Sequence, residues 1–184
     1  MEKEKLVFVT QNQNKLSDAR LLMPGFDITH VDFEVPEIQS LNPQEIIAYK
    51  IKYAYEEVGR PCFVMDASLN IDSLAGFPGP LIKWYFKSVG ADKICQIASL
   101  FTEMGCSWTT VLGYFNGEEF TYLDETVKGS LPENPRGTNG YDWDVIFVPE
   151  GEERTLAEMT FDEKQQYAVT KKLLGRFENF LKEK

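Results

Sequence analysis

A short apolar run that ends on a single carboxylate places the strongest constraint on the fold of this chain. Residues 62–65 (Cys-Phe-Val-Met) read as a buried strand, and Asp66 follows at once, with Ser68 two residues later. In α/β proteins, ligands gather at the carboxyl ends of strands, so a strand-end aspartate can bind a metal or accept a proton from water. The same residue can instead cap a turn, and these residues alone leave both readings open.

The other apolar runs alternate with amphipathic segments, a pattern that predicts a mixed α/β fold. Asn42, Pro43 and Glu45 form a strong helix start, and Gly59 ends that helix. Asn116-Gly117, between two further runs, predicts a hairpin. We expect strands over 6–9, 27–35, 69–74, 107–114 and 119–127, helices over 15–22, 42–58, 81–88 and 91–104, and a long final helix after the capping box Thr160–Glu163.

Composition limits the classes of function. The 184 residues are 43% hydrophobic and can bury the core of one domain, residues 1–184. The formal net charge of −10 argues against binding of nucleic-acid polymers, which need a broad basic surface. A few lysines that converge locally would still bind a small anion. No apolar run approaches the ~18 residues of a membrane span, so we expect no membrane partner.

Cysteine usage points to a reducing compartment, and histidine usage argues against a histidine-based site. Cys62, Cys95 and Cys106 are widely spaced and odd in number. They exclude a disulfide framework, disfavour a zinc site and predict a cytoplasmic protein. The single histidine, His30, lies in a polar–apolar alternation that predicts a surface position. A histidine-based triad or metal site therefore has little to build on.

Two polar loops are candidates for ligand binding. Loop 10–14 joins a strand to a helix that begins near Lys15, and a helix N-terminus favours phosphate, although an ordinary turn has the same pattern. Loop 129–144 ends in Tyr141, Trp143 and Asp144. Aromatic side chains between carboxylates can stack on a nucleobase, and they can equally fill the core.

Motifs along nearly the whole chain resemble the inosine triphosphate pyrophosphatase family, also called the non-canonical purine NTP pyrophosphatases. Each fragment is modest alone, but together their order and spacing match that family. The matching pieces are Val7-Phe8-Val9-Thr10-x-Asn12-x-x-Lys15-Leu16, Pro36-Glu37-Ile38-Gln39, Asp66 with Gly76-x-Pro78-Gly79-Pro80-x-Ile82-Lys83-Trp84, Arg136-Gly137, Tyr141-x-Trp143-Asp144, and Thr155-x-Ala157-Glu158-Met159 with Lys164.

The resemblance implies a two-lobed single domain around a long mixed β-sheet flanked by helices, usually as a homodimer. It implies Mg²⁺-dependent hydrolysis of a nucleoside triphosphate to the monophosphate and pyrophosphate, typically of deaminated purines such as ITP, dITP and XTP. The alternative is a family member that kept the fold, lost turnover and acts as a nucleotide-binding or interaction protein.

The resemblance also implies a role for each residue of the matched motifs. Asp66 and Lys15 would be catalytic, with Asp66 orienting or deprotonating the attacking water. Glu37 and Asp66 would bind Mg²⁺, which can lower the pKa of water and neutralise developing charge. Substrate contacts are implied for Thr10, Asn12, Lys15, Lys50 and Lys83 at the phosphates, for Tyr141, Trp143, Asp144 and Lys164 at the base, and for Ser68.

Two departures from the family pattern affect the expected chemistry. The family's acidic residue before the aspartate is Met65 here, which removes a carboxylate from the metal neighbourhood and predicts slower turnover or a different metal dependence. The family's Ser-His-Arg, which reads the 6-oxo purine edge, falls on Ala168-Val169-Thr170, so we expect an altered base preference. A further reading keeps ordinary inosine specificity, with the base read by backbone groups and Asp144.

Overall fold

The structure is a computed structural model that describes residues 3–140 and 142–184. Its contacts divide the chain into two compact units. The first unit comprises Met1–Asp66, Thr110–Glu125 and Thr170–Lys184, and the second comprises Ala67–Thr109 and Thr126–Val169. That residues 1–184 form a single domain stays a prediction.

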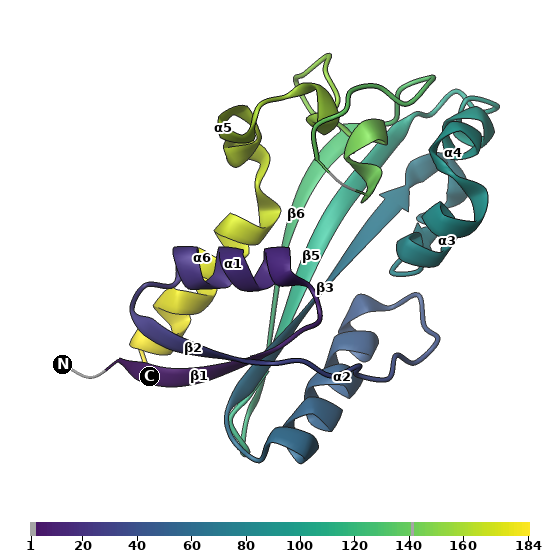
Figure 1. Ribbon diagram of the computed structural model, residues 1–184. Helices are drawn as coiled ribbons and strands as arrows, with labels where there is room; N and C mark the ends of the chain where they lie inside the picture. Colours follow the sequence, from purple (N-terminus) through teal and green to yellow (C-terminus); the bar gives the residue numbers. More distant parts are fainter. Residues whose placement is uncertain (1–2, 141) are drawn as a thin grey trace. The chain divides into compact units, whose positions relative to one another are not determined.

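Seven strands of the described residues form one mixed sheet in the order β2-β1-β3-β5-β6-β7, with β4 paired to β3 (Figure 1). β1 pairs in parallel with β2 and β3, whereas β4 and β7 pair antiparallel with β3 and β6. The predicted α/β class with a long mixed sheet is confirmed. The strands are β1 Glu4–Val9, β2 Phe26–Val31, β3 Cys62–Ile71, β4 Pro78–Gly79, β5 Gly105–Phe115, β6 Phe120–Ser130 and β7 Val148–Pro149.

Six α-helices flank this sheet in the described residues, with short 3-10 turns between some of them. No helix of residues 3–140 and 142–184 is long and apolar enough to cross a membrane. The helices are α1 Gln13–Leu22, α2 Pro43–Val58, α3 Ile82–Val89, α4 Ala91–Ala98, α5 Phe161–Lys164 and α6 Val169–Lys182.

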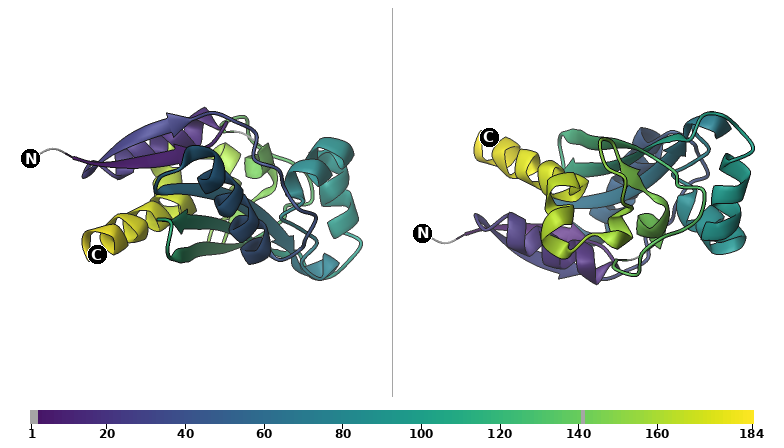
Figure 2. Two further views of the ribbon diagram at one scale, coloured as in Figure 1. Left: turned by 90° about the horizontal axis from the view of Figure 1, so that it is seen from below. Right: turned by 90° about the horizontal axis from the view of Figure 1, so that it is seen from above.

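The first unit has a separate apolar core on each face of its strands. Phe8 and Phe63 pack with residues of α1 and α6, and their rings stack 4.2 Å apart. Val7 and Val64, one position along each strand, pack with Ile47 and other residues of α2. This alternation follows from the two-residue period of a strand. α1 and α6 therefore cover one face and α2 the other, and α2 lies in front when the unit is seen from below (Figure 2).

Local sequence signals account for α2. The Asn42 side chain accepts a hydrogen bond from the Gln44 amide, and Pro43 occupies the first turn. Gly59 ends the helix in the left-handed conformation, with φ 67°. The buried stripe contains Lys50 among isoleucines and alanine. The predicted bounds of this helix are confirmed, and its packing turns Lys50 toward the strands.

The second unit has its own core. α3 and α4 contribute Ile82, Ile94 and Cys95, each at most 1% exposed, to a cluster that also holds Phe147 and Met159. This core fixes the segments that carry Asp144 and Lys164.

The predicted hairpin is confirmed in the first unit, because the Asn116 side chain accepts hydrogen bonds from the two amides that begin the return to β6.

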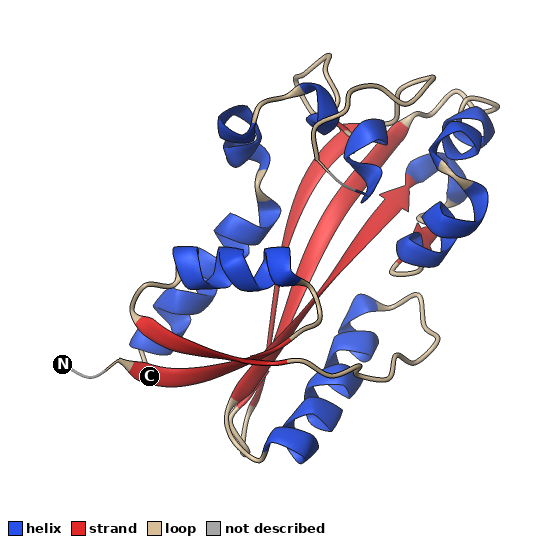
Figure 3. Cartoon of the chain, in the orientation of Figure 1, coloured by secondary structure: helices blue, strands red, loops and turns tan. Residues whose placement is uncertain are grey.

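One prediction about β3 is wrong. The sequence predicted a strand that ends at Asp66 and a second strand from Leu69, but β3 runs unbroken from Cys62 to Ile71 (Figure 3). Asp66 is therefore an interior strand residue. The polar side chains of Asp66 and Ser68 do not interrupt the strand, because side chains leave the backbone perpendicular to it and leave its hydrogen bonds intact.

Other helix and strand boundaries also differ from prediction. α4 ends at Ala98 instead of residue 104, and Phe101, within the predicted helix, is 49% exposed. β2 ends at Val31 instead of residue 35. The capping box at Thr160 begins only the four-residue α5, and the long helix begins later, at Val169. Capping fixes where a helix begins, whereas tertiary contacts decide how far it continues.

We predict that Phe177→Ala lowers the free energy of unfolding by about 3–5 kcal/mol, the usual cost of a large buried aromatic side chain. Phe177 is fully buried and contacts the rings of Phe63 and Tyr114. Urea denaturation followed by tryptophan fluorescence measures the change. Phe161→Ala is the matched control, because Phe161 is 71% exposed. Equal losses in the two variants would contradict the assigned core.

Candidate active site

The first unit holds a buried ammonium group between two carboxylates. Lys50 Nζ on α2 lies 2.8 Å from Glu37 Oε1 and 3.0 Å from Asp66 Oδ2. The Lys50 side chain is 11% exposed, against 48% for Glu37 and 27% for Asp66. Burial disfavours the charged ammonium, but the charges and hydrogen bonds of Asp66 and Glu37 outweigh it and raise the pKa of Lys50. Three predicted site residues therefore meet at one point, which we call the Lys50 centre.

A second lysine reaches β3 from the opposite face of the strand. Lys15, on α1, donates from Nζ to the backbone carbonyl of Met65 at 3.3 Å. The Met65 side chain is 5% exposed and packs in the same core as Leu16 of α1, whereas Asp66 faces Lys50. An acidic side chain at position 65 would therefore face the α1 side. The carboxylate that the family resemblance implies at this position would therefore lie on the side of Lys15.

The loop before α1 is held by its own polar groups. Asn12 caps α1, and its Oδ1 accepts from the amides of Asn14 and Lys15 at 2.9 and 3.1 Å. The Thr10 hydroxyl accepts from the Asn12 amide at 3.1 Å. The predicted residues Thr10, Asn12 and Lys15 therefore lie together in one strand–loop–helix turn. This cap orients the amides of the first turn, where the helix dipole favours an anion.

His30, on β2, was missed as a contact of this loop. The sequence predicted a surface position, but His30 is half-buried and its Nε2 lies 2.7 Å from the carbonyl oxygen of Thr10. The Thr10 amide donates to the Val31 carbonyl at 3.2 Å and extends the parallel pairing. β2 thereby fixes the start of the loop. The register of two parallel strands brings these residues together, and a lone histidine in the sequence carries no such signal.

The second unit contains an ion pair between two of the residues predicted to contact the base. Lys164 Nζ lies 2.9 Å from Asp144 Oδ2 and donates to the Asn139 carbonyl at 3.0 Å. Both side chains are largely buried, at 18% and 12% exposure. A Cβ atom on Gly140 would overlap Asp144 Oδ2 and crowd Lys164 Nζ. Another predicted base contact, Tyr141, lies outside the described residues.

The other predicted site residues of this unit differ in burial and in their contacts. Trp143 packs edge-on against Trp108, with ring centroids 6.3 Å apart, at the margin of the core. Ser68 is 2% exposed, and its hydroxyl has no hydrogen-bond partner among the described residues. Lys83 is exposed in the first turn of α3, with Nζ 5.8 Å from the centre of the Trp84 ring. Within this unit, Lys83 is not part of the Asp144–Lys164 pair.

Val169, which stands where the family pattern has histidine, is buried. Val169 is 1% exposed at the start of α6, so its side chain belongs to the interior. An imidazole in its place would need a buried hydrogen-bond partner of its own. The comparison of Ala168-Val169-Thr170 with the family's Ser-His-Arg therefore gives no support to base recognition by residue 169.

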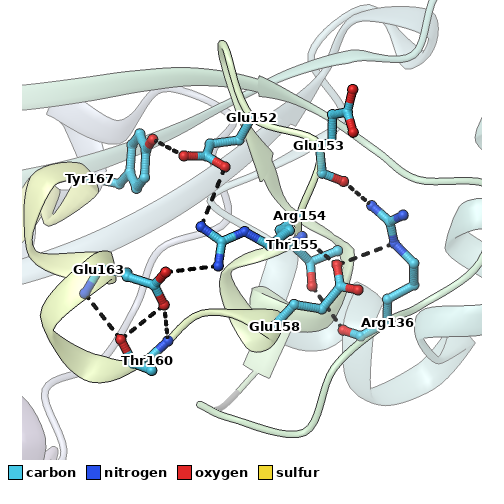
Figure 4. Close-up of polar contacts among 9 residues, drawn as sticks. All are labelled: Arg136, Glu152, Glu153, Arg154, Thr155, Glu158, Thr160, Glu163 and Tyr167. Atoms are coloured by element: carbon cyan, nitrogen blue, oxygen red, sulfur yellow. Dashed lines mark hydrogen bonds and ion pairs between the residues drawn. The ribbon is translucent and has the colours of Figure 1, made fainter.

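Two consecutive capping boxes stabilise the segment that carries Lys164. Glu158 accepts from the Thr155 amide at 2.7 Å, and Glu163 accepts from the Thr160 amide at 2.8 Å. Each glutamate also meets an arginine, Arg136 at 3.4 Å and Arg154 at 2.8 Å (Figure 4).

Further hydrogen bonds join this segment to loop 129–144. The Thr155 hydroxyl donates to the Arg136 carbonyl at 2.9 Å, and the amides of Thr138 and Asn139 both donate to the Ala157 carbonyl. Arg154 also approaches Glu152, which accepts from the Tyr167 hydroxyl (Figure 4). The sequence identified the Thr160 box but gave no sign of these arginine contacts.

The Lys50 centre suits a hard divalent cation. No group of three or more histidine, cysteine or acidic side chains able to hold a metal occurs in the part of the chain that the structure describes. Mg²⁺ commonly uses only one or two carboxylates, with water and substrate phosphates as its other ligands. Glu37 and Asp66 already converge on one cationic group, so their oxygens fit that pattern.

These features define an α/β protein with a capped strand–loop–helix turn and a buried lysine between two carboxylates. The chain belongs to the Ham1 family, whose model matches residues 6–179. It is 35% identical to a dITP/XTP pyrophosphatase of Methanopyrus kandleri, over 97% of this chain and 96% of that protein. It is 36% identical to the inosine triphosphate pyrophosphatase of Schizosaccharomyces pombe, over 88% and 86%. The resemblance seen in the motifs is confirmed.

Solved structures show the same fold. The Ham1 protein of Staphylococcus aureus superimposes with a TM-score of 0.86 at 23% identity, over 97% of this chain and 98% of that one. A HAM1 protein of Coxiella burnetii gives the same TM-score and identity, over 98% and 100%. The arrangement of strands and helices is therefore that of the Ham1 proteins.

We predict that Glu163→Gln flattens the acid side of the stability profile. Hydrogen bonds from the Thr160 backbone and the Arg154 side chain lower the pKa of Glu163 from 4.5 to about 2. A lowered pKa stabilises the folded state above the unfolded pKa, and this contribution is lost as pH falls from about 4.5 through about 2. The variant should be less stable at neutral pH and should lose less stability over that window.

Thermal melts between pH 2 and pH 7 measure this effect. Asp162→Asn is the matched control, because it removes a carboxylate from the same helical turn and leaves the Arg154 contact in place. We expect the control to keep the wild-type acid slope. An unchanged slope in Glu163→Gln would show that the capping glutamate does not carry the effect.

Proposed function

We propose that this chain hydrolyses non-canonical purine nucleoside triphosphates, such as ITP, dITP or XTP, to the monophosphate and pyrophosphate in a Mg²⁺-dependent reaction. Family membership and the names of the relatives support the reaction class. The observation that carries the proposal is the Lys50 centre, because it joins two acidic ligands and a cationic group that suits phosphate.

Glu37 and Asp66 would hold the metal. When bound, Mg²⁺ would offset the negative charge of the triphosphate and favour ionisation of a nearby water. Asp66 would orient that water or accept its proton, because its carboxylate is partly exposed and fixed by Lys50. The bond that breaks joins the α- and β-phosphates, and pyrophosphate leaves.

Lysines and the capped turn would neutralise the phosphate chain. Lys15 and Lys50 carry the charge, and the first-turn amides of α1 add the favourable end of the helix dipole. Lys83, exposed on α3, would add a further cation. The positive charges of Lys15 and Lys50, both at β3, would allow a protein of net charge −10 to bind a polyanion.

The second unit would contribute the base contacts. Asp144 and Lys164 form a buried acceptor–donor pair, and such a pair can discriminate the polar edge of a purine. Trp143 and Tyr141 would supply aromatic surface, and Ser68 a hydroxyl. A base that leaves these buried groups unpaired would bind poorly.

Three broader assignments stay proposals. We propose that residues 1–184 act as one domain and assemble as a homodimer, both on the family resemblance. Light scattering on the purified protein measures its mass in solution. We propose a cytoplasmic location, supported by the three cysteines, which are buried and unpaired.

The decisive experiment is a product analysis. The protein is incubated with Mg²⁺ and a panel of canonical, deaminated and modified (d)NTPs, and monophosphate, diphosphate, phosphate and pyrophosphate are resolved. Monophosphate with pyrophosphate in equal amounts is the expected result, and it identifies the preferred base. Thermal stabilisation by nucleotides without any release would favour the alternative, a nucleotide-binding protein that has lost turnover.

We predict that Asp66→Asn lowers the rate of pyrophosphate release by ~10²-fold or more, because the amide cannot accept the proton of water. The variant should keep the wild-type circular dichroism spectrum. Asp27→Asn removes an exposed carboxylate from β2 in the same unit and should retain full activity. Wild-type activity in Asp66→Asn would rule out the assigned role.

We predict that Gly140→Ala raises KM for the preferred nucleotide by roughly tenfold or more, because a hydrogen bond to a charged group contributes about 1.5–3 kcal/mol. The new methyl group would displace the Asp144–Lys164 pair. Gly151→Ala is the matched control, since both glycines have positive φ (106° and 84°) but nothing lies within 4 Å of a Cβ on Gly151. If the two variants change KM equally, backbone strain and not the pair is responsible.

A further inference from the structure

The Lys50 ammonium group lies between the two candidate metal ligands, Glu37 and Asp66, where a metal ion would bind. Its ammonium group bridges Glu37 Oε1 and Asp66 Oδ2 at 2.8 and 3.0 Å, and the side chain is 11% exposed. We propose that Lys50 competes with the metal for these carboxylates and exchanges them for the triphosphate when metal and nucleotide bind together. This inference rests on the proposed function, since it requires a metal and a phosphate chain at the same centre.

The balance of charge supports the exchange. The three groups together carry one net negative charge, so a divalent cation is attracted to them only weakly while the ammonium stays beside the carboxylates. Two like charges a few ångströms apart repel strongly where solvent is partly excluded. An arriving metal must therefore share or displace the ammonium, and the free protein should bind the metal poorly.

The nucleotide provides the second half of the exchange. A triphosphate brings several negative charges, which give the displaced ammonium a new partner. Lysine suits such a transfer, because its charge lies at the end of a flexible four-carbon chain. Metal and nucleotide should then strengthen each other's binding by the same factor, as linkage requires.

Lys15 and Lys50 reach β3 from different helices. Lys15 Nζ contacts the Met65 carbonyl from the α1 side of β3, whereas Lys50 contacts both carboxylates from α2. The proposal therefore concerns one lysine of the phosphate-binding set. Its consequence is specific: loss of the Lys50 charge should improve metal binding in the absence of nucleotide.

The test measures Mn²⁺ binding to the nucleotide-free protein by electron paramagnetic resonance of the free ion. We expect Lys50→Met to bind Mn²⁺ about tenfold or more tightly than the wild type, because the competing charge is gone. Lys50→Arg keeps that charge and should bind Mn²⁺ as weakly as the wild type. Lys52→Met, which removes an exposed lysine from the same helix, should leave Mn²⁺ affinity unchanged.

A second measurement repeats the titrations with an α,β-methylene nucleoside triphosphate, which cannot be cleaved at the proposed bond. The analogue should raise Mn²⁺ affinity in the wild type and much less in Lys50→Met. If Lys50→Met fails to fold, Lys50→Gln, which keeps a polar side chain without the charge, takes its place in both titrations.

The outcomes separate this inference from the proposed function. Equal or weaker Mn²⁺ binding by the uncharged variants would overturn it, since Lys50 would then hold the carboxylates in place for the metal. That result would leave pyrophosphate release by the wild type unaffected. Conversely, the wild type could release no pyrophosphate while Lys50→Met binds Mn²⁺ more tightly than the wild type does. That result would support the competition and refute the enzyme assignment.

Discussion

The alternation of side chains along β3 is the constraint on which the Lys50 centre depends. Phe63 and Met65 point to the face covered by α1 and α6, and Val64 and Asp66 point to the face covered by α2. A change of register by one residue would exchange these faces and bury the carboxylate of Asp66 among aromatic rings. The apolar neighbours of Asp66 therefore decide where its charge lies.

This alternation also sets the distribution of charge around β3. Lys50 reaches the strand from α2 and bonds to Asp66, and Lys15 reaches it from α1 and bonds to the Met65 carbonyl. Burial alone would make the Lys50 ammonium unfavourable, and two carboxylates offset that cost. An isolated lysine on the apolar stripe of α2 would be expected to extend toward solvent. Here the partners on β3 and in the loop before α2 hold it inside.

The sequence predicted those features whose cause is local. The caps of α2, the turn at Asn116-Gly117 and the capping box at Thr160 each depend on a few adjacent residues, and all are present. Features that depend on distant segments were missed. The end of α4, the continuity of β3 and the contact between His30 and Thr10 depend on packing and strand register, which a single sequence does not reveal.

In the candidate site, likewise, individual residues were identified from the sequence, whereas their contacts were not. Asp66 was identified from its place after an apolar run, and Glu37 and Lys50 through a family resemblance, but nothing in the sequence indicated that a lysine of α2 would bridge the other two. The Asp144–Lys164 pair joins residues twenty positions apart. Its geometry also requires a glycine at position 140, because any side chain there would overlap the pair.

A glycine in a loop sequence usually reads as a turn residue, and φ of 106° at Gly140 agrees with that reading. The close approach of Asp144 and Lys164 is a second and independent requirement. Gly151 has a similar backbone conformation with open space around it, so conformation alone does not distinguish the two positions. Only the folded arrangement separates a glycine that permits a turn from one that also makes room for an ion pair.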